Sequence, residues 1–208
     1  MAIFAEDAFT SGSDQTLQAY SALWNRHTSF ATDATVLTAT GNVRGGSDAA
    51  TSVYYRSETP QSADYDVQAD CSTTQAGNSR SGVVGRCDTA AQTFYYLYLD
   101  SSTGQLTMAK AVAGVFTGIG TPYAIPSYAH NTPYTIRLNM TGTSLTGYLN
   151  GVSRITATDS SISAAGKAGI ILRLYDRIDN WSAYDGTGAL FRRRRGRAPI
   201  GLEGVRVY

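Results

Sequence analysis

Apolar and polar residues alternate in steps of two along the segment TIRLNM, in the second half of the chain. Ile136, Leu138 and Met140 fall on one side of an extended chain, and Arg137 and Asn139 fall on the other. This period is typical of a strand that buries one face and exposes the opposite one. The segment therefore predicts a half-buried β-strand.

The pair Asn150-Gly151 stands between two further strand-like segments, SLTGYL and VSRITAT. Asn and Gly readily adopt the two positive φ angles of a type I′ turn, which is the turn that joins two antiparallel strands most tightly. The pattern predicts a β-hairpin, and with it an antiparallel sheet.

Short β-rich segments recur along most of the chain, among them TSVYYRS, DYDVQADC, TFYYLYLD and AGIILRLYD, and each is bounded by Gly-, Pro- or Asn-rich turns. The best helix candidate is a short turn in TLQAYSALW. Many short strands at even spacing favour an all-β antiparallel sandwich. We expect one such domain over residues 1–186 and a separate arm over residues 187–208.

Several motifs carry a resemblance to a known superfamily: FAEDAFTSGSDQTLQAYSALWN, YYLYLDSSTGQLTMAKAVAG, the Asn-Gly hairpin and the ending Asp179-Asn180-Trp181. Together they resemble the concanavalin A-like lectin/glucanase superfamily. More narrowly, they are similar to the laminin-G-like jelly-roll domains of bacteriophage particle proteins and bacterial surface proteins. The resemblance implies a jelly-roll β-sandwich. Proteins with this fold bind sugars, bind proteins, hydrolyse glycans or decorate surfaces, so it leaves the function open.

Aromatic and arginine side chains are the candidates for binding. Alternation places them opposite the expected core residues, and they would share one face if their strands share one sheet. Such a face suits a glycan, a protein partner or an exposed sheet with no ligand. The candidates are Tyr54, Arg56, Arg86, Tyr96, Tyr98, Arg173 and Tyr175.

An atypical carboxylate pair, Asp64 and Asp66, is the alternative that would make the protein a glycan-active hydrolase. The two carboxyl groups are two residues apart, as are paired acids on one strand of retaining glucanases. The glutamates of the glucanase pattern are missing: Gln68 and Asp70 follow on the same face. We therefore expect a polar stripe on a strand and no enzyme activity.

The arm is distinguished by near-contiguous positive charge, since Phe191 is followed by Arg192, Arg193, Arg194, Arg195 and Arg197. Such charges repel one another and resist folding alone. A solvated tail, an anchor on an acidic partner surface and a nucleic-acid contact are all compatible with this pattern. The alternation in the final residues GVRVY favours an ordered end, and Phe191 beside the arginines fits an anchor or interaction segment. The formal net charge of +1 gives no overall attraction to nucleic acid.

Cys71 and Cys87 are the only cysteines. A hairpin centred near Ser79 would place the two cysteines opposite one another, close enough to form a disulfide if the local geometry permits it. We favour two reduced core residues, because no secretory signal precedes them. No cofactor is expected, and calcium is the one metal that relatives of this fold make conceivable, through carboxylates in loops.

The N-terminal segment contains Glu6 and Asp7 where a signal peptide would be basic and then apolar. No window approaches the ~18 apolar residues that a membrane-spanning helix needs. The resemblance then implies a non-enzymatic structural or adhesive component of a larger assembly, such as a phage particle. It would be made in the host cytoplasm, be oligomeric within the particle, contact other particle proteins and bind cell-surface glycans. A free lectin and the hydrolase are the alternatives.

Overall fold

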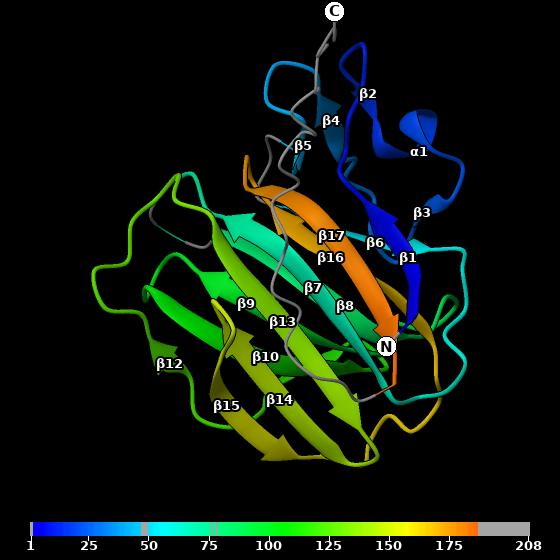
Figure 1. Ribbon diagram of the computed structural model, residues 1–208, viewed down its shortest axis with the longest axis vertical. Coiled ribbons are helices and arrows are strands. Elements are labelled where there is room, and N and C mark those ends of the chain that lie inside the picture. The colour runs from blue at the N-terminus through cyan, green and yellow to red at the C-terminus, as the bar shows by residue number, and fades with distance from the viewer. Residues whose placement is uncertain (1, 47–49, 76, 78, 187–208) are drawn as a thin grey trace, which may run out of the picture.

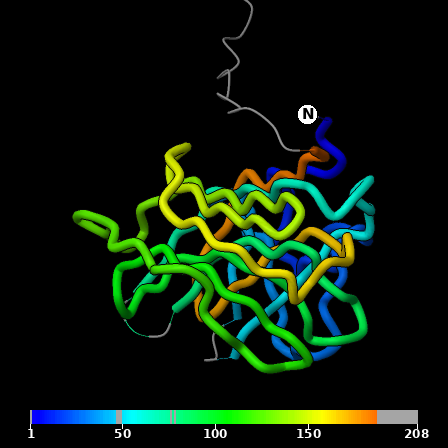
Figure 2. Tube along the Cα trace, turned by 90° about the horizontal axis from the view of Figure 1, so that it is seen from below, coloured from blue at the N-terminus to red at the C-terminus, as the bar shows by residue number. Residues whose placement is uncertain are grey.

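The computed structural model describes residues 2–46, 50–75, 77 and 79–186. Two antiparallel sheets stack face to face, as Figures 1 and 2 show from two directions. The predicted jelly-roll sandwich is confirmed. No helix in the described ranges has the length and apolar character to cross a membrane. The arm, including Phe191 and the arginines that follow it, lies outside the described residues.

Sheet A has the strand order β15-β14-β13-β7-β17-β5-β4-β2, and β1 pairs with β17 beside this path. In chain order its strands are β1 (Ala2–Asp7), β2 (Gln15–Thr16), β4 (Thr35–Leu37), β5 (Asn42–Arg44), β7 (Tyr65–Ser72), β13 (Tyr134–Thr141), β14 (Ser144–Leu149), β15 (Val152–Thr158) and β17 (Arg177–Asp185).

Sheet B has the order β11-β10-β9-β8-β16-β6-β3, and β12 pairs with β10. Its strands are β3 (Trp24–Arg26), β6 (Thr51–Arg56), β8 (Arg80–Cys87), β9 (Phe94–Asp100), β10 (Gln105–Val112), β11 (Val115–Gly118), β12 (Tyr123–Ala124) and β16 (Lys167–Arg173). The short helix α1 (Leu17–Tyr20) follows β2, within the predicted helical turn, and the hydroxyl of Thr16 caps its first turn.

The core lies between the sheets and follows the alternation seen in the sequence. Ile136, Leu138 and Met140 of β13 are fully buried. The hairpin of β14 and β15 is also confirmed, because Asn150 and Gly151 both have positive φ and their flanking residues pair. One face of sheet A is thereby committed to the core, and its other face is left for polar side chains.

The segment Asp179-Asn180-Trp181 forms an irregularity in β17. Asn180 has a φ of 51°, which lets the chain turn its amide to the outer face while Trp181 enters the core. The Trp181 indole donates to the carbonyl oxygen of Gly169 in sheet B at 3.1 Å, and its ring packs against Trp24 with centroids 5.0 Å apart. This motif therefore ties the two sheets together.

The expected hairpin around Ser79 is wrong. Cys71 lies on β7 in sheet A and Cys87 on β8 in sheet B, so the connection between them crosses from one sheet to the other. A turn-rich segment marks a reversal of the chain. It does not show whether the strand after the turn pairs with the strand before it or joins the other sheet. Both cysteines are buried and free, which agrees with the prediction of two reduced core residues.

Candidate functional site

The outer face of sheet A carries rows of polar side chains that run across its strands. In the central row, Tyr148 of β14, Arg137 of β13, Gln68 of β7, Ser182 of β17 and Glu6 of β1 are successive register partners. Register partners on neighbouring strands point to the same side of the sheet, within contact of each other. Alternation has thus built a five-strand polar row over an apolar core.

Asp66 lies in the next row and is held from two sides. Asn139 and Arg137 both bind its carboxylate, and the Arg137 guanidinium lies 3.7 Å from the centre of the Tyr148 ring. Asp66 is fully buried by these neighbours, and burial raises the pKa of Asp66, although Asn139 and Arg137 act in the opposite direction. Asp66 therefore positions its neighbours and is not open to a ligand.

Asp70 organises the third row. The Thr135 hydroxyl donates to Oδ1 of Asp70 at 2.6 Å, and the Asn180 amide donates to Oδ2 at 2.8 Å. Oδ1 of Asn150, in the hairpin turn, accepts from the backbone N–H of Thr135 at 3.0 Å. The hairpin turn is thereby fixed against the floor of the sheet.

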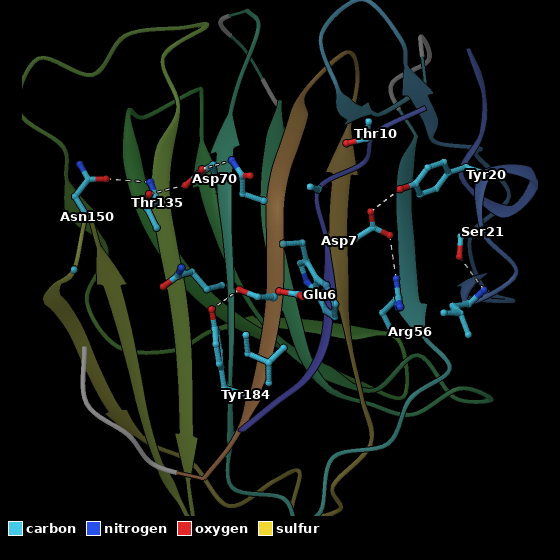
Figure 3. A pocket seen from close by; sticks show the side chains of 18 of the residues that line it. Glu6, Asp7, Thr10, Tyr20, Ser21, Arg56, Asp70, Thr135, Asn150 and Tyr184 are labelled. Carbon is cyan, nitrogen blue, oxygen red and sulfur yellow. Dashed lines mark hydrogen bonds and ion pairs between the residues drawn. The ribbon is translucent and has the colours of Figure 1, made fainter. Parts of the chain in front are cut away.

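A cleft of ≈ 1470 Å³ runs over these rows. In Figure 3, Asn150, Thr135 and Asp70 lie toward one end and Asp7, Tyr20 and Arg56 toward the other. Gln68, Ser182 and Tyr184 line the middle, so the cleft crosses several strands of sheet A. Its length and its mixture of aromatic and hydrogen-bonding groups suit an extended polar ligand.

Asp7 anchors the wall of the cleft beside α1. Its Oδ1 accepts from the backbone N–H of Phe9 and from the Tyr20 hydroxyl, both at 2.8 Å. Its Oδ2 accepts from the Trp24 indole at 2.9 Å and from Nη1 of Arg56 at 3.0 Å. Burial, together with the negative charge of Asp7, raises the pKa of Tyr20 to about 12. The wall is therefore held rigidly by one carboxylate.

The predicted binding residues do not form one exposed face. Tyr54 is in the core, and its hydroxyl donates to Asp33 at 3.1 Å. Arg56 lines the cleft, but its guanidinium lies between Asp7 and Glu58 and stacks over Trp24. Of the predicted site residues that the structure describes, Arg56 alone lines the cleft, and its role there is to hold the wall.

Arg86 does not point to the solvent side of β8. It has a φ of 48°, in a stretch where the register with β16 shifts, so the alternation used to place it breaks down. Its guanidinium is buried and donates to the carbonyl oxygens of Ala63, Ile162 and Gly142. Its role is to fix three loops at one end of the sandwich.

Tyr96 and Tyr98 do lie on the outer face of sheet B, but neighbouring side chains cover them. Their exposed fractions are only 3% and 7%, and their rings stack 5.3 Å apart. Arg173 is half-buried on the same face and faces Arg80 in register. Tyr175 is exposed, in the turn between β16 and β17. Tyr96 and Tyr98 therefore belong to a second apolar cluster on this face, and of the four predicted residues Tyr175 alone is exposed.

The carboxylate pair of the hydrolase alternative is also divided. Asp64 precedes β7, accepts from the backbone N–H of Gly142 at 2.7 Å and lines a separate hollow of ≈ 220 Å³. Asp66 is buried, as described above. Among the described residues no three His, Cys, Asp or Glu side chains gather where they could hold a metal ion.

The cleft residues that the sequence did not predict include Glu6, Asp7, Tyr20, Thr135, Asn150, Ser182 and Tyr184. Gln68 and Asp70 were seen as a polar stripe, and alternation placed them correctly. The order of the strands was the missing information, because it alone brings β1, β7, β13 and β17 side by side.

No protein-family model matches the chain, and no curated protein matches its sequence. Solved structures do match its fold. Carbohydrate-binding module CBM66 from Bacillus subtilis is 20% identical, with a TM-score of 0.65, over 78% of this chain and 96% of the module. The protein has the concanavalin A-like jelly-roll fold.

Two further structures agree with this assignment. A Bacillus subtilis protein of unknown function with a galectin-like fold is 12% identical, with a TM-score of 0.65, over 89% of this chain and 96% of that one. The beta-glucanase of Bacillus licheniformis is 13% identical, with a TM-score of 0.60, over 90% of this chain and the whole of the glucanase. This jelly roll thus shares its fold with carbohydrate-binding and glycan-active proteins, as the sequence resemblance implies.

Proposed function

We propose that this jelly roll binds carbohydrate in the cleft on the outer face of sheet A. The observation that carries the proposal is the cleft itself, ≈ 1470 Å³ in volume and lined by polar rows that cross several strands. Its shared fold with a carbohydrate-binding module and a glucanase supports the same class of ligand.

The chemistry of the cleft suits sugar hydroxyls. Glu6 and Asp70 offer carboxylate oxygens as acceptors, and Gln68 offers both a donor and an acceptor. Tyr20 is half-buried and adds aromatic surface, against which the C–H face of a sugar ring can pack. Asp7 and Asp70 already accept hydrogen bonds from the side chains around them. Few side chains of the cleft therefore have to lose freedom when a glycan binds.

A glycan array followed by calorimetric titration tests this proposal. Gln68→Ala removes a cleft side chain and should weaken binding about threefold to tenfold, the effect of one or two lost hydrogen bonds. Gln105→Ala is the matched control, because Gln105 lies on β10 in sheet B, away from the cleft. Failure of the wild-type protein to bind any glycan would contradict the proposal, and so would equal effects of the two variants.

We propose further that binding is not followed by cleavage. The carboxylate of Asp66 already accepts hydrogen bonds from Arg137 and Asn139, and Asp64 lines a different hollow. This separation of the two carboxyl groups supports a non-enzymatic role. Incubation with the bound oligosaccharides, followed by chromatography of new reducing ends, tests it. Release of fragments that Asp66→Asn abolishes would establish the hydrolase alternative instead.

Display on a phage particle or another large assembly stays a prediction from the sequence resemblance. Its test is a protein ending at residue 186, compared with the full chain for incorporation into particles. Loss of incorporation with unchanged glycan binding is expected if residues 187–208 act as an anchor. Equal incorporation would contradict the anchor role.

A further inference from the structure

Two arginines face each other on the outer side of sheet A, just beyond the cleft. Arg177 at the start of β17 and Arg44 at the end of β5 are register partners. The residues beside them, Ile178 and Val43, are fully buried in the core. Alternation therefore directs both arginines to the outer face, which is also the face of the cleft.

This pair has no acidic partner among the described residues. Neither guanidinium takes part in an ion pair there, and the Nε atoms of Arg44 and Arg177 are buried without a hydrogen-bond partner. Like charges directly opposite each other on neighbouring strands destabilise a sheet. A structure that keeps such a pair has a place where a bound negative charge would be stabilised.

The neighbours of the pair add further donors. Ser72 of β7 is the next register partner of Arg177, and Thr35 of β4 is the next partner of Arg44. Arg44 also stacks on the exposed Tyr175 ring, with the guanidinium carbon 5.4 Å from the ring centre. Two guanidinium groups flanked by two hydroxyls form a row of hydrogen-bond donors, the arrangement that recognises an oxyanion.

We propose that Arg44 and Arg177 bind a carboxylate or sulfate substituent of the glycan in the cleft, so that the protein selects acidic glycans. This proposal rests on the carbohydrate-binding function proposed above. Arg177 is two residues along β17 from Asp179, the register partner of Asp70 in the cleft floor, a distance of about 7 Å. A ligand that fills this end of the cleft therefore reaches the pair with its next polar group.

The acidic side chains between the cleft and the pair do not oppose this assignment. The Asn180 amide donates to Asp70 at 2.8 Å and to Asp179 at 3.1 Å, and Thr135 also donates to Asp70. These neutral donors stabilise the two carboxylates, and the two positive charges of Arg44 and Arg177 offset the negative charges of Asp70 and Asp179 at the proposed site.

The experiment compares a galacturonic acid trimer with its methyl ester by calorimetric titration against the full chain. Esterification removes the negative charge of each carboxylate and adds one methyl group to it, while the sugar rings and their hydroxyls stay the same. The wild type should bind the acid at least tenfold more tightly than the ester, as expected for one or more charge-assisted hydrogen bonds. Arg177→Gln and Arg44→Gln should each remove most of this preference and leave ester affinity unchanged.

Arg80→Gln is the matched control. Arg80 also faces another arginine in register, Arg173, but on the outer face of sheet B. It should keep the preference for the acid. Loss of the preference in Arg80→Gln, with retention in Arg177→Gln, would place the anion on the opposite sheet and overturn the proposal.

The outcomes separate this proposal from the carbohydrate-binding function. Equal affinity of the wild type for acid and ester would overturn the anion site and leave carbohydrate binding intact. If neither trimer binds, thermal unfolding in sodium sulfate against sodium chloride of equal ionic strength decides. Stabilisation by sulfate that Arg177→Gln abolishes would support an anion site at this pair, and no such difference would overturn it.

Discussion

Replacement of Asp7 by Asn tests whether one carboxylate holds the α1 wall of the cleft. Asn has nearly the same shape as Asp, but only one of its two terminal atoms accepts hydrogen bonds. The Asp7 side chain is 8% exposed and that of Arg56 is 5% exposed, so water cannot readily replace a lost partner. The variant therefore isolates the hydrogen-bonding role of the second oxygen.

The expected cost follows from the four donors that converge on Asp7. In either amide orientation two of them, Phe9 N–H with the Tyr20 hydroxyl or the Trp24 indole with Arg56, meet an NH₂ group instead of an oxygen. An unsatisfied buried donor costs about 1–3 kcal/mol, and more where it is charged. Arg56 keeps Glu58, which limits the loss. We expect a loss of about 3 kcal/mol, or a fall in Tm of roughly 6–12 °C for a chain of this size.

Urea unfolding followed by tryptophan fluorescence measures this loss. Asp33→Asn is the control, because Asp33 also accepts from an arginine and a tyrosine, Arg26 and Tyr54, but its side chain is 51% exposed. Its cost should stay below about 1 kcal/mol, as for other exposed pairs. A loss below about 1 kcal/mol in Asp7→Asn, or equal losses in the two variants, would refute the reasoning.

Three further substitutions have outcomes that the structure fixes. Burial raises the pKa of Asp176 to about 6 against the bonds from Ser79 and Thr74. The folded protein therefore binds the proton of Asp176 more tightly than the unfolded chain does. Ionisation of Asp176 then lowers the free energy of unfolding as pH rises from about 4 to 7. Asp176→Asn should be more stable than wild type by about 2 kcal/mol at pH 7, and the difference in urea midpoints should vanish near pH 4. Burial opposes ionisation of Asp159, but bonds from Lys110, Tyr95 and Ser161 outweigh it and hold the pKa of Asp159 below its usual range. Asp159→Asn should therefore cost about 1–2 kcal/mol at pH 7, a loss that shrinks as the wild-type carboxylate protonates in acid; a loss that grows in acid would contradict this. Asn150→Ala loses a favourable residue at positive φ and the bond to Thr135, so it should cost about 1–2 kcal/mol and speed amide exchange at Thr135. Unchanged exchange there would show that the turn does not need the amide.

The sequence predicted correctly those features that depend on one strand or one turn alone. Period-two alternation placed Ile136 and Leu138 in the core and Arg137 outside it, because the pleat alone sets the side to which each residue points. The Asn-Gly hairpin was equally local, since two residues supply its turn. Both predictions needed no knowledge of the remaining chain.

Predictions about the site failed where the direction or exposure of a side chain depends on more than one strand. Arg86 was misplaced because an irregular stretch of β8 changes the side to which it points. The one sign of this in the sequence is Gly85, which directly precedes Arg86, since a glycine inside a strand often marks a bulge. Tyr96 lies on the predicted outer face, but exposure depends on neighbours such as Phe94 and Phe116, which pack against its ring. Glu6 joins Gln68 in one row only because β1 and β7 flank β17, and residues far apart along the chain give no sign of this.

Two kinds of charged pair lie on or beside the outer face of sheet A, and the difference between them argues for separate roles. Asp66 with Arg137, and Asp7 with Arg56, are buried pairs whose partners are already in place. Removal of one partner leaves an uncompensated buried charge, so such substitutions act on stability first. Arg44 and Arg177 oppose each other without an acid among the described residues, so neutralising one of them removes a repulsion from the free protein. Arg177→Gln should therefore leave the free protein at least as stable as wild type while it weakens binding of an acidic ligand. A structural role for the pair demands the reverse, a loss of stability without ligand.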